Sequence, residues 1–282
     1  MNFLELRIFD NITEYRKAVL VVLLEDEVRN NLPISIMMDN KTDGASGRLL
    51  AAVIDSKGAV ILTAVCIKPF NLLLYETGGI RRDDAVGLLA QELRRSGFTP
   101  PGVTAEQDLA RRFTGAYLQG GHGKLHMPMY LMRLDKLAEY ITAPGSCRML
   151  EERDISYAPY WEHEFCVECR VSELTIKENT DRIRTRIGKD IHFIWEDTVP
   201  VSQAVHGRDT PNGAIINWVY TPPRYRGNGY ATSVVAALVD SLLNNGKSFC
   251  CLFADAENPA SRGVYRKLGF YDVCIFEDIR FE

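Results

Sequence analysis

The chain has 282 residues, of which 46% are hydrophobic and 25% are charged, and this composition fits two globular domains of average size. Its net charge of -4 excludes the broad basic field of a nucleic-acid-binding protein. The apolar run Ala18–Leu24 is far shorter than the roughly 18 residues of a membrane span, so we expect neither a membrane partner nor a signal peptide. Seven irregularly spaced cysteines predict reduced thiols in a cytoplasmic protein.

The first half of the chain predicts a helix, three strands, two helices and a final strand. Asp55-Ser56-Lys57-Gly58 is a hairpin signal between the first two strands. Helical spacing of Val86, Leu89 and Leu93 supports the second helix, which we expect to stop at Gly97. In chain order the expected elements are Thr13–Asn30, Leu49–Ile54, Val60–Ile67, Asn71–Glu76, Asp83–Arg95, Ala105–Gln119 and Leu125–Arg133.

The second half repeats this plan after Pro144-Gly145, a plausible domain boundary. Its expected elements are helices Pro159–Arg170 and Glu173–Ile187, strands Ile191–Glu196, Pro200–Arg208 and Ala214–Thr221, a helix to Asn245, strand Ser248–Asp255, helix Pro259–Leu268 and strand Asp272–Phe281. The sequence therefore predicts an α/β fold with mixed sheets, in two tandem domains of similar architecture that span residues 1–145 and 146–282.

The segment Tyr225–Thr232, YRGNGYAT, stands between a strand and a long helix. A helix N-terminus presents backbone N–H groups and a partial positive charge, and glycines let an anion approach these groups closely. The segment matches neither a lysine-bearing phosphate loop nor the glycine pattern of nicotinamide-binding proteins. We therefore expect a diphosphate to bind here.

Two motifs carry a resemblance to a known family. Arg226-x-x-Gly229-x-Ala231 resembles the pyrophosphate motif of the GNAT superfamily of acyl-CoA-dependent N-acetyltransferases. Downstream, Asn258, Tyr265 and Leu268-Gly269-Phe270 resemble the second signature of that superfamily, in the same order. The resemblance covers roughly Glu151 to Glu282, and VYTPPRYRGNGYA is similar to the glycine N-acyltransferase-like branch.

The resemblance implies a site for acetyl-CoA as acyl donor, with no metal. Backbone groups of the strand end would pair with the pantetheine arm, the glycine segment would hold the diphosphate, and Asn258 would bond the cofactor near the pantetheine. The implied cofactor-binding residues are Val219, Tyr220, Thr221, Arg226, Gly227, Asn228, Gly229, Tyr230, Ala231, Thr232 and Asn258.

Tyr265 is the implied catalytic residue, as the acid that protonates the departing thiolate. The amide of Val219 would stabilise the tetrahedral oxyanion. Both motif residues of the last helix also have structural interpretations. Asn258 before Pro259 is a good helix N-cap, and Tyr265 could be a core aromatic.

The general base does not transfer from the family, because Phe253 stands where many members have glutamate. Asp255, Glu257 and Glu282 are the carboxylate alternatives, and a water chain or an amine that arrives neutral is a further one. In the first half the matching turn has Gly78 and Gly79 but continues into Asp83 and Asp84. Carboxylates there would repel a diphosphate, so we expect this half to be a degenerate copy that binds no cofactor.

Two other patterns favour a structural interpretation over a functional site. His163-x-x-Cys166-x-x-Cys169 offers only three zinc ligands, and the spacing fits one side of a helix, so we expect free or structural thiols. The segment Gly120–Lys124, GGHGK, lacks the glycine and the hydroxyl residue of a phosphate loop, and we expect a loop with His122 exposed.

The sequence favours an acetyl-CoA-dependent N-acetyltransferase that acts on a primary amine of a small molecule or peptide. The alternative is a sensor or scaffold that binds CoA or acyl-CoA without turnover, which the absence of the usual glutamate would favour. The sequence does not identify the acceptor amine, the acyl chain length or the oligomeric state.

Overall fold

The structure is a computed structural model that describes residues 3–38, 46–171 and 174–281. Its strands are β1 (Leu4–Ile8), β2 (Arg48–Asp55), β3 (Val60–Ile67), β4 (Leu72–Glu76), β5 (Gly102–Glu106), β6 (Lys124–Leu134), β7 (Ser146–Met149), β8 (His192–Asp197), β9 (Val199–Asp209), β10 (Gly213–Tyr220), β11 (Phe249–Asp255) and β12 (Tyr271–Arg280). Its α-helices are α1 (Ile12–Leu24), α2 (Asn31–Met38), α3 (Asp83–Ser96), α4 (Gln107–Tyr117), α5 (Ala158–Glu168), α6 (Ile176–Arg184), α7 (Tyr230–Asn244) and α8 (Pro259–Lys267).

The strands form a mixed sheet in the order β1-β2-β3-β4-β5-β12-β6-β11-β10-β9-β8-β7. The pairs β4/β5 and β10/β11 are parallel, whereas the hairpin-connected pairs are antiparallel. The predicted α/β class with mixed sheets is therefore confirmed. The chain divides into two compact units, the first of residues 1–131 and 273–282 and the second of residues 132–272.

The compact units depart from the predicted halves at the last strand. Strand β12 was predicted as the last strand of the second half, yet it pairs with β5 in the first unit, from Phe276 opposite Glu106 to Arg280 opposite Gly102. The buried carboxylate of Glu277 accepts hydrogen bonds from Arg111 and Gln107 of α4, which attaches β12 to this unit. The division of function between residues 1–145 and 146–282 stays a prediction.

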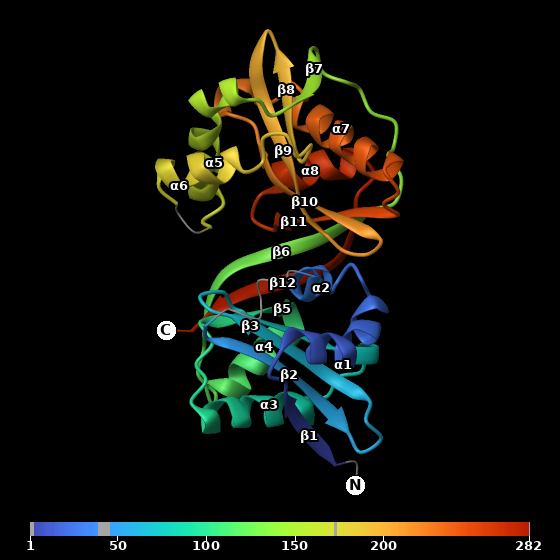
Figure 1. Ribbon diagram of the computed structural model, residues 1–282, viewed down its shortest axis with the longest axis vertical. Helices are drawn as coiled ribbons and strands as arrows, with labels where there is room; N and C mark the ends of the chain where they lie inside the picture. The colour runs from blue at the N-terminus through green and yellow to red at the C-terminus, as the bar shows by residue number, and fades with distance from the viewer. Residues whose placement is uncertain (1–2, 39–45, 172–173, 282) are drawn as a thin grey trace. The chain divides into compact units, whose positions relative to one another are not determined.

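The sheet of the first unit is covered on both faces (Figure 1). Alternate residues of β2 point to opposite sides, because the side-chain period of a strand is two. Leu49, Ala51 and Val53 join the core under α3 and α4, whereas Leu50 and Ala52 join the core under α1 and α2.

The second unit has the same plan. Helices α5 and α6 pack against each other on one side of its strands, and α7 lies on the other side (Figure 1). Ile194 of β8 joins a core cluster with Ala158 of α5 and Ile183 of α6. Helix α8 packs against α7 and β11.

The largest difference from the expected elements is the first helix. It was predicted as Thr13–Asn30, but α1 ends at Leu24 and α2 begins at Asn31. The buried side chain of Asn30 donates to Leu23 O at 2.9 Å, and that of Asn31 donates to Val28 O at 2.7 Å. These bonds compete with the helical backbone pattern and explain the break. The short strands β1, β5 and β7 were not predicted, and α4 begins at Gln107 rather than Ala105.

All seven cysteines are free thiols. Over the residues that the structure describes, no helix has the length and apolar character needed to cross a membrane.

Candidate functional site

The parallel strands β10 and β11 diverge towards their carboxyl ends. Their pairing ends at Ile215 opposite Cys251, yet β10 continues to Tyr220 and β11 to Asp255. The ends of the two strands are therefore free of each other. The predicted residues Val219, Tyr220 and Thr221 lie at this splayed end, where an extended ligand could add to the edge of β10.

A β-bulge shapes the same end of β10. Asn217 pairs with Val205 and Tyr220 with Gln203, so two residues of β10 stand opposite one residue of β9. Trp218 adopts a positive φ of 54° there, which is unusual for a large side chain.

Side chains of β9 hold the bulge. Gln203 Nε2 donates to Trp218 O at 3.4 Å, and Ser202 Oγ donates to Tyr220 O at 3.2 Å. These bonds satisfy the carbonyls of Trp218 and Tyr220, and they hold the backbone of Val219 between them in place.

A buried histidine contacts the side chain of Gln203. His192 on β8 is 1% exposed, and its Nε2 lies 3.2 Å from Gln203 Oε1. Burial, assisted by the nearby charge of Arg186, lowers the pKa of His192 to about 3. The imidazole is therefore neutral in the folded protein at any pH near neutrality.

We expect acid to destabilise the fold through His192. Its pKa is lowered in the folded state, so below about pH 6.5 the unfolded chain binds a proton that the folded protein does not. This stability is present above that pH and is lost as the pH falls towards 3. By pH 5 the loss is about 2 kcal/mol. Urea unfolding of the wild type and His192→Gln at pH 8 and pH 5 measures it, and equal pH dependence in both proteins would contradict this origin.

The N-terminus of α7 has free backbone donors. Its N-cap is Gly229, with a φ of 82° and no side chain to cap the helix, and Gly227 has a φ of 83°. The first α-helical bond is donated by Ser233 to Gly229 O at 3.0 Å. Among the residues that the structure describes, no side chain or loop carbonyl accepts from the six amides from Gly227 to Thr232. A Cβ on Gly227 would meet no atom within 4 Å, so this loop has room for an anion.

Hydrogen bonds and an ion pair made by side chains of the same loop hold it in place. Arg226 Nε donates to Thr221 O at 2.9 Å, and its Nη2 lies 2.7 Å from both carboxylate oxygens of Glu168. Asn228 Nδ2 donates to Tyr225 O at 3.1 Å. The hydroxyl of Tyr230 donates to Asp197 at 2.5 Å. The loop therefore offers its main chain rather than the side chains of Arg226, Asn228 and Tyr230.

The two motif residues of α8 have the structural roles that the sequence also allowed, an N-cap for Asn258 and a core aromatic for Tyr265. Asn258 is the N-cap, and its Oδ1 accepts from Ser261 N at 3.1 Å, which leaves its Nδ2 group outside the cap. Tyr265 is 6% exposed and packs edge-on against Phe270, with ring centroids 5.8 Å apart. Burial raises the pKa of Tyr265 to about 12, so its phenol keeps its proton at neutral pH.

Two of the candidate bases lie at the end of β11. Asp255 Oδ1 accepts from Glu257 N at 2.8 Å, and both carboxylates face Arg170, at 3.6 Å from Asp255 and 2.7 Å from Glu257. Phe253 lies on β11, half-buried. The third candidate, Glu282, lies outside the described residues.

In the first unit the parallel strands β4 and β5 diverge in the same way, but a carboxylate of the protein lies at their ends. The pairing of β4 and β5 ends at Leu73 opposite Thr104, although β4 continues to Glu76. Glu76 accepts from Arg82 N at 2.7 Å and from Arg112 Nη2 at 2.5 Å. A carboxylate of the protein thus occupies the place where the second unit has free amides.

Carboxylates of α3 itself also neutralise the partial positive charge at the N-terminus of that helix. Asp84 Oδ1 accepts from Ala85 N at 3.0 Å in the first turn of α3, and Arg112 reaches Asp83 at 3.2 Å. Phe113 follows the N-cap Glu106 of α4 by the same seven positions that separate Tyr265 from Asn258. In this unit carboxylates therefore bind the amides of Arg82 and Ala85, and a phenylalanine stands where the second unit has a phenol.

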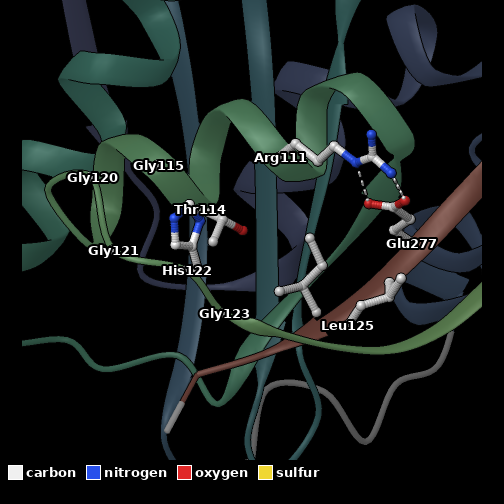
Figure 2. A pocket seen from close by; sticks show the side chains of 10 residues that line it. Arg111, Thr114, Gly115, Gly120, Gly121, His122, Gly123, Leu125 and Glu277 are labelled. Carbon is white, nitrogen blue, oxygen red and sulfur yellow. Dashed lines mark hydrogen bonds and ion pairs between the residues drawn. The ribbon is translucent and has the colours of Figure 1, made fainter.

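A cavity of about 520 Å³ lies in the first unit, between α4, the GGHGK loop and β12 (Figure 2). Arg111 and Glu277 form an ion pair at one side of it, and His122 is exposed at the other. None of the predicted site residues lines it.

Comparisons with known proteins agree with these features. The family model described as "FR47-like protein" matches residues 198–278, which hold the bulge, the glycine loop and α8. A GCN5-related N-acetyltransferase from Sphaerobacter thermophilus shares 15% identity and a TM-score of 0.69, over 99% of this chain and 95% of that one. The chain has the GNAT acetyltransferase fold.

Two further GNAT structures are similar over nearly the whole length. A GNAT-family acetyltransferase from Colwellia psychrerythraea has 10% identity and a TM-score of 0.63, with 98% and 100% of the two chains covered. A tandem GNAT protein from the clavulanic acid biosynthesis pathway has 15% identity and a TM-score of 0.58, with 99% and 98% covered. The predicted tandem GNAT architecture is thereby confirmed. No curated protein matches the chain in sequence.

The three residues weighed as zinc ligands do not form a metal site. Cys166 is fully buried in α5, and among the described residues no group of three or more histidine, cysteine or acidic side chains is placed to hold a metal ion.

Proposed function

We propose that this protein is an acetyl-CoA-dependent N-acetyltransferase whose second unit binds the cofactor and transfers the acetyl group to a primary amine. The observation that carries the proposal is the row of free amides from Gly227 to Thr232 at the mouth of two diverging strands. The phosphate groups of a diphosphate suit the exposed N–H groups and the partial positive charge of such a helix N-terminus. The pantetheine arm would then extend along the bulged end of β10, with Asn258 Nδ2 as a further donor.

The proposed reaction is a direct attack in a ternary complex. The neutral amine attacks the thioester carbonyl carbon, and the amide of Val219 stabilises the oxyanion that forms. The C–S bond then breaks, and the phenol of Tyr265 donates to the departing thiolate. The proton that the attacking nitrogen loses goes to Asp255, to Glu257 or to water. The acceptor is a small molecule or a peptide.

The first unit differs at the corresponding place. Glu76, Asp83 and Asp84 place negative charge where a diphosphate would have to bind. We therefore assign this unit no cofactor.

A second candidate is a CoA sensor without turnover. Phe253 in place of the usual glutamate favours it, whereas the buried, protonated Tyr265 favours the enzyme. Both candidates require cofactor binding, and they differ in whether an acceptor amine makes the protein release free thiol from acetyl-CoA.

Thermal unfolding with and without acetyl-CoA tests the binding that both candidates share. A ligand at 100 times its Kd stabilises the folded state by about 2.7 kcal/mol, which raises Tm by several degrees. Pantetheine, which lacks the diphosphate, serves as the matched control and should shift Tm much less. No shift with millimolar acetyl-CoA would contradict the proposal. A panel of amines assayed for thiol release then separates enzyme from sensor.

A further inference from the structure

Helix α5 ends in a motif that usually requires glycine. Arg170 N donates to Val167 O at 3.3 Å, and Val171 N donates to Cys166 O at 3.1 Å, which is the hydrogen-bond pattern of a Schellman cap. The cap residue after Cys169 must adopt left-handed geometry, and here it is Arg170 with a φ of 53°. A side chain at this position costs free energy that glycine would avoid.

The guanidinium of Arg170 reaches the end of β11. Its Nη2 lies 2.7 Å from Glu257 Oε2 and 3.6 Å from Asp255 Oδ2. Asp255 is the last residue of the part of β11 that has separated from β10, and Glu257 follows it by two positions.

Two residues earlier, Glu168 reaches the other strand. Both of its carboxylate oxygens lie 2.7 Å from Arg226 Nη2, and Arg226 in turn donates to Thr221 O just beyond the end of β10. Glu168 and Arg170 thus tie the end of α5 to both of the diverging strands. Cys169 lies between them, half-buried.

We propose that Glu168 and Arg170, which flank Cys169, form an ionic clasp across the mouth between β10 and β11, and that this clasp must open for the cofactor to enter and leave. The clasp rests on the proposed function, because it regulates access to the same site. It also makes Glu168 and Arg170 positioning residues. Glu168 acts on the diphosphate loop through Arg226, and Arg170 acts on Asp255 and Glu257.

The ion pairs of the clasp are weak enough for it to open often. The pairs Glu168–Arg226 and Arg170–Glu257 have side chains between 39% and 61% exposed, and only Asp255, at 3.6 Å from Arg170, is more buried, at 16%. Exposed ion pairs are weak and screened by salt. Removal of one pair should therefore raise the rates of cofactor association and dissociation by about two- to fivefold. Because both rates rise, Kd should change less than either rate.

Thiol labelling tests the clasp without any cofactor. Opening exposes Cys169, so its rate of modification by a maleimide should rise about two- to fivefold in Glu168→Gln and in Arg170→Gly. Arg170→Gly is the informative variant, because it removes the guanidinium while it relieves the left-handed strain, and the fold should persist. Cys169→Ser gives the background from the other cysteines. Arg184→Gln removes a surface charge that pairs with Glu152 and is the matched control.

Stopped-flow binding of acetyl-CoA to the same proteins completes the test. Faster labelling together with faster cofactor association and dissociation supports the clasp. Faster labelling with no acetyl-CoA binding to the wild type would overturn the proposed function and leave the clasp as a contact of α5. If the wild type binds acetyl-CoA but the variants match Arg184→Gln in labelling and in both rates, the clasp is wrong.

Discussion

Tyr265→Phe is expected to lower kcat for acetyl transfer on the order of a hundredfold or more, because a positioned general acid contributes about that much to catalysis. The substitution removes one hydroxyl from a ring that is 6% exposed and packed against Phe270, so the core around it is kept. The affinity for acetyl-CoA should stay within about twofold of the wild type, because the diphosphate loop and β10 are untouched.

Turnover and binding must be measured on the same preparation. Steady-state thiol release gives kcat, and calorimetric titration with acetyl-CoA gives Kd. A variant with full turnover would remove Tyr265 from the mechanism. A variant that loses affinity in proportion to rate would show that the phenol only binds the cofactor.

Ala231→Asp is expected to weaken acetyl-CoA binding roughly 10- to 100-fold, by like-charge repulsion of the diphosphate at close range. The residue occupies the second position of α7, as Asp84 does in α3 of the first unit. The same carboxylate interacts favourably with the helix dipole, so the free energy of unfolding should rise by about 0.3–1 kcal/mol.

The matched control is Ala231→Asn, which has nearly the same size without the charge. Isothermal titration gives Kd for both variants, and chemical unfolding gives their stability. Loss of binding with gain of stability in the aspartate variant alone is the expected pattern. Equal affinities of the two variants would show that no negative group of the ligand lies near this helix turn.

The elements around the site could be predicted because their signals are local. The glycines before α7 and the Asn-Pro start of α8 each act within a few residues of sequence. The same locality explains why Asp83 and Asp84 could be placed at the start of α3 from the residues alone, whereas the bond from Arg82 N to Glu76 was not predicted.

The features that were missed depend on distant partners. Strand β12 pairs with β5 from about 170 residues away, and nothing in its own sequence indicates that neighbour. The bulge at Trp218 depends on Gln203 and Ser202 of the adjacent strand. Glu168 and Arg170 read as surface charges until the fold places them beside Arg226 and Glu257.

A crystal structure of the protein with acetyl-CoA tests the central claim most directly. We predict that the diphosphate oxygens lie about 2.7–3.2 Å from backbone nitrogens between Gly227 and Thr232. No cofactor should lie at the N-terminus of α3. A diphosphate bound elsewhere, or a loop that remains empty at saturating ligand, would contradict the account.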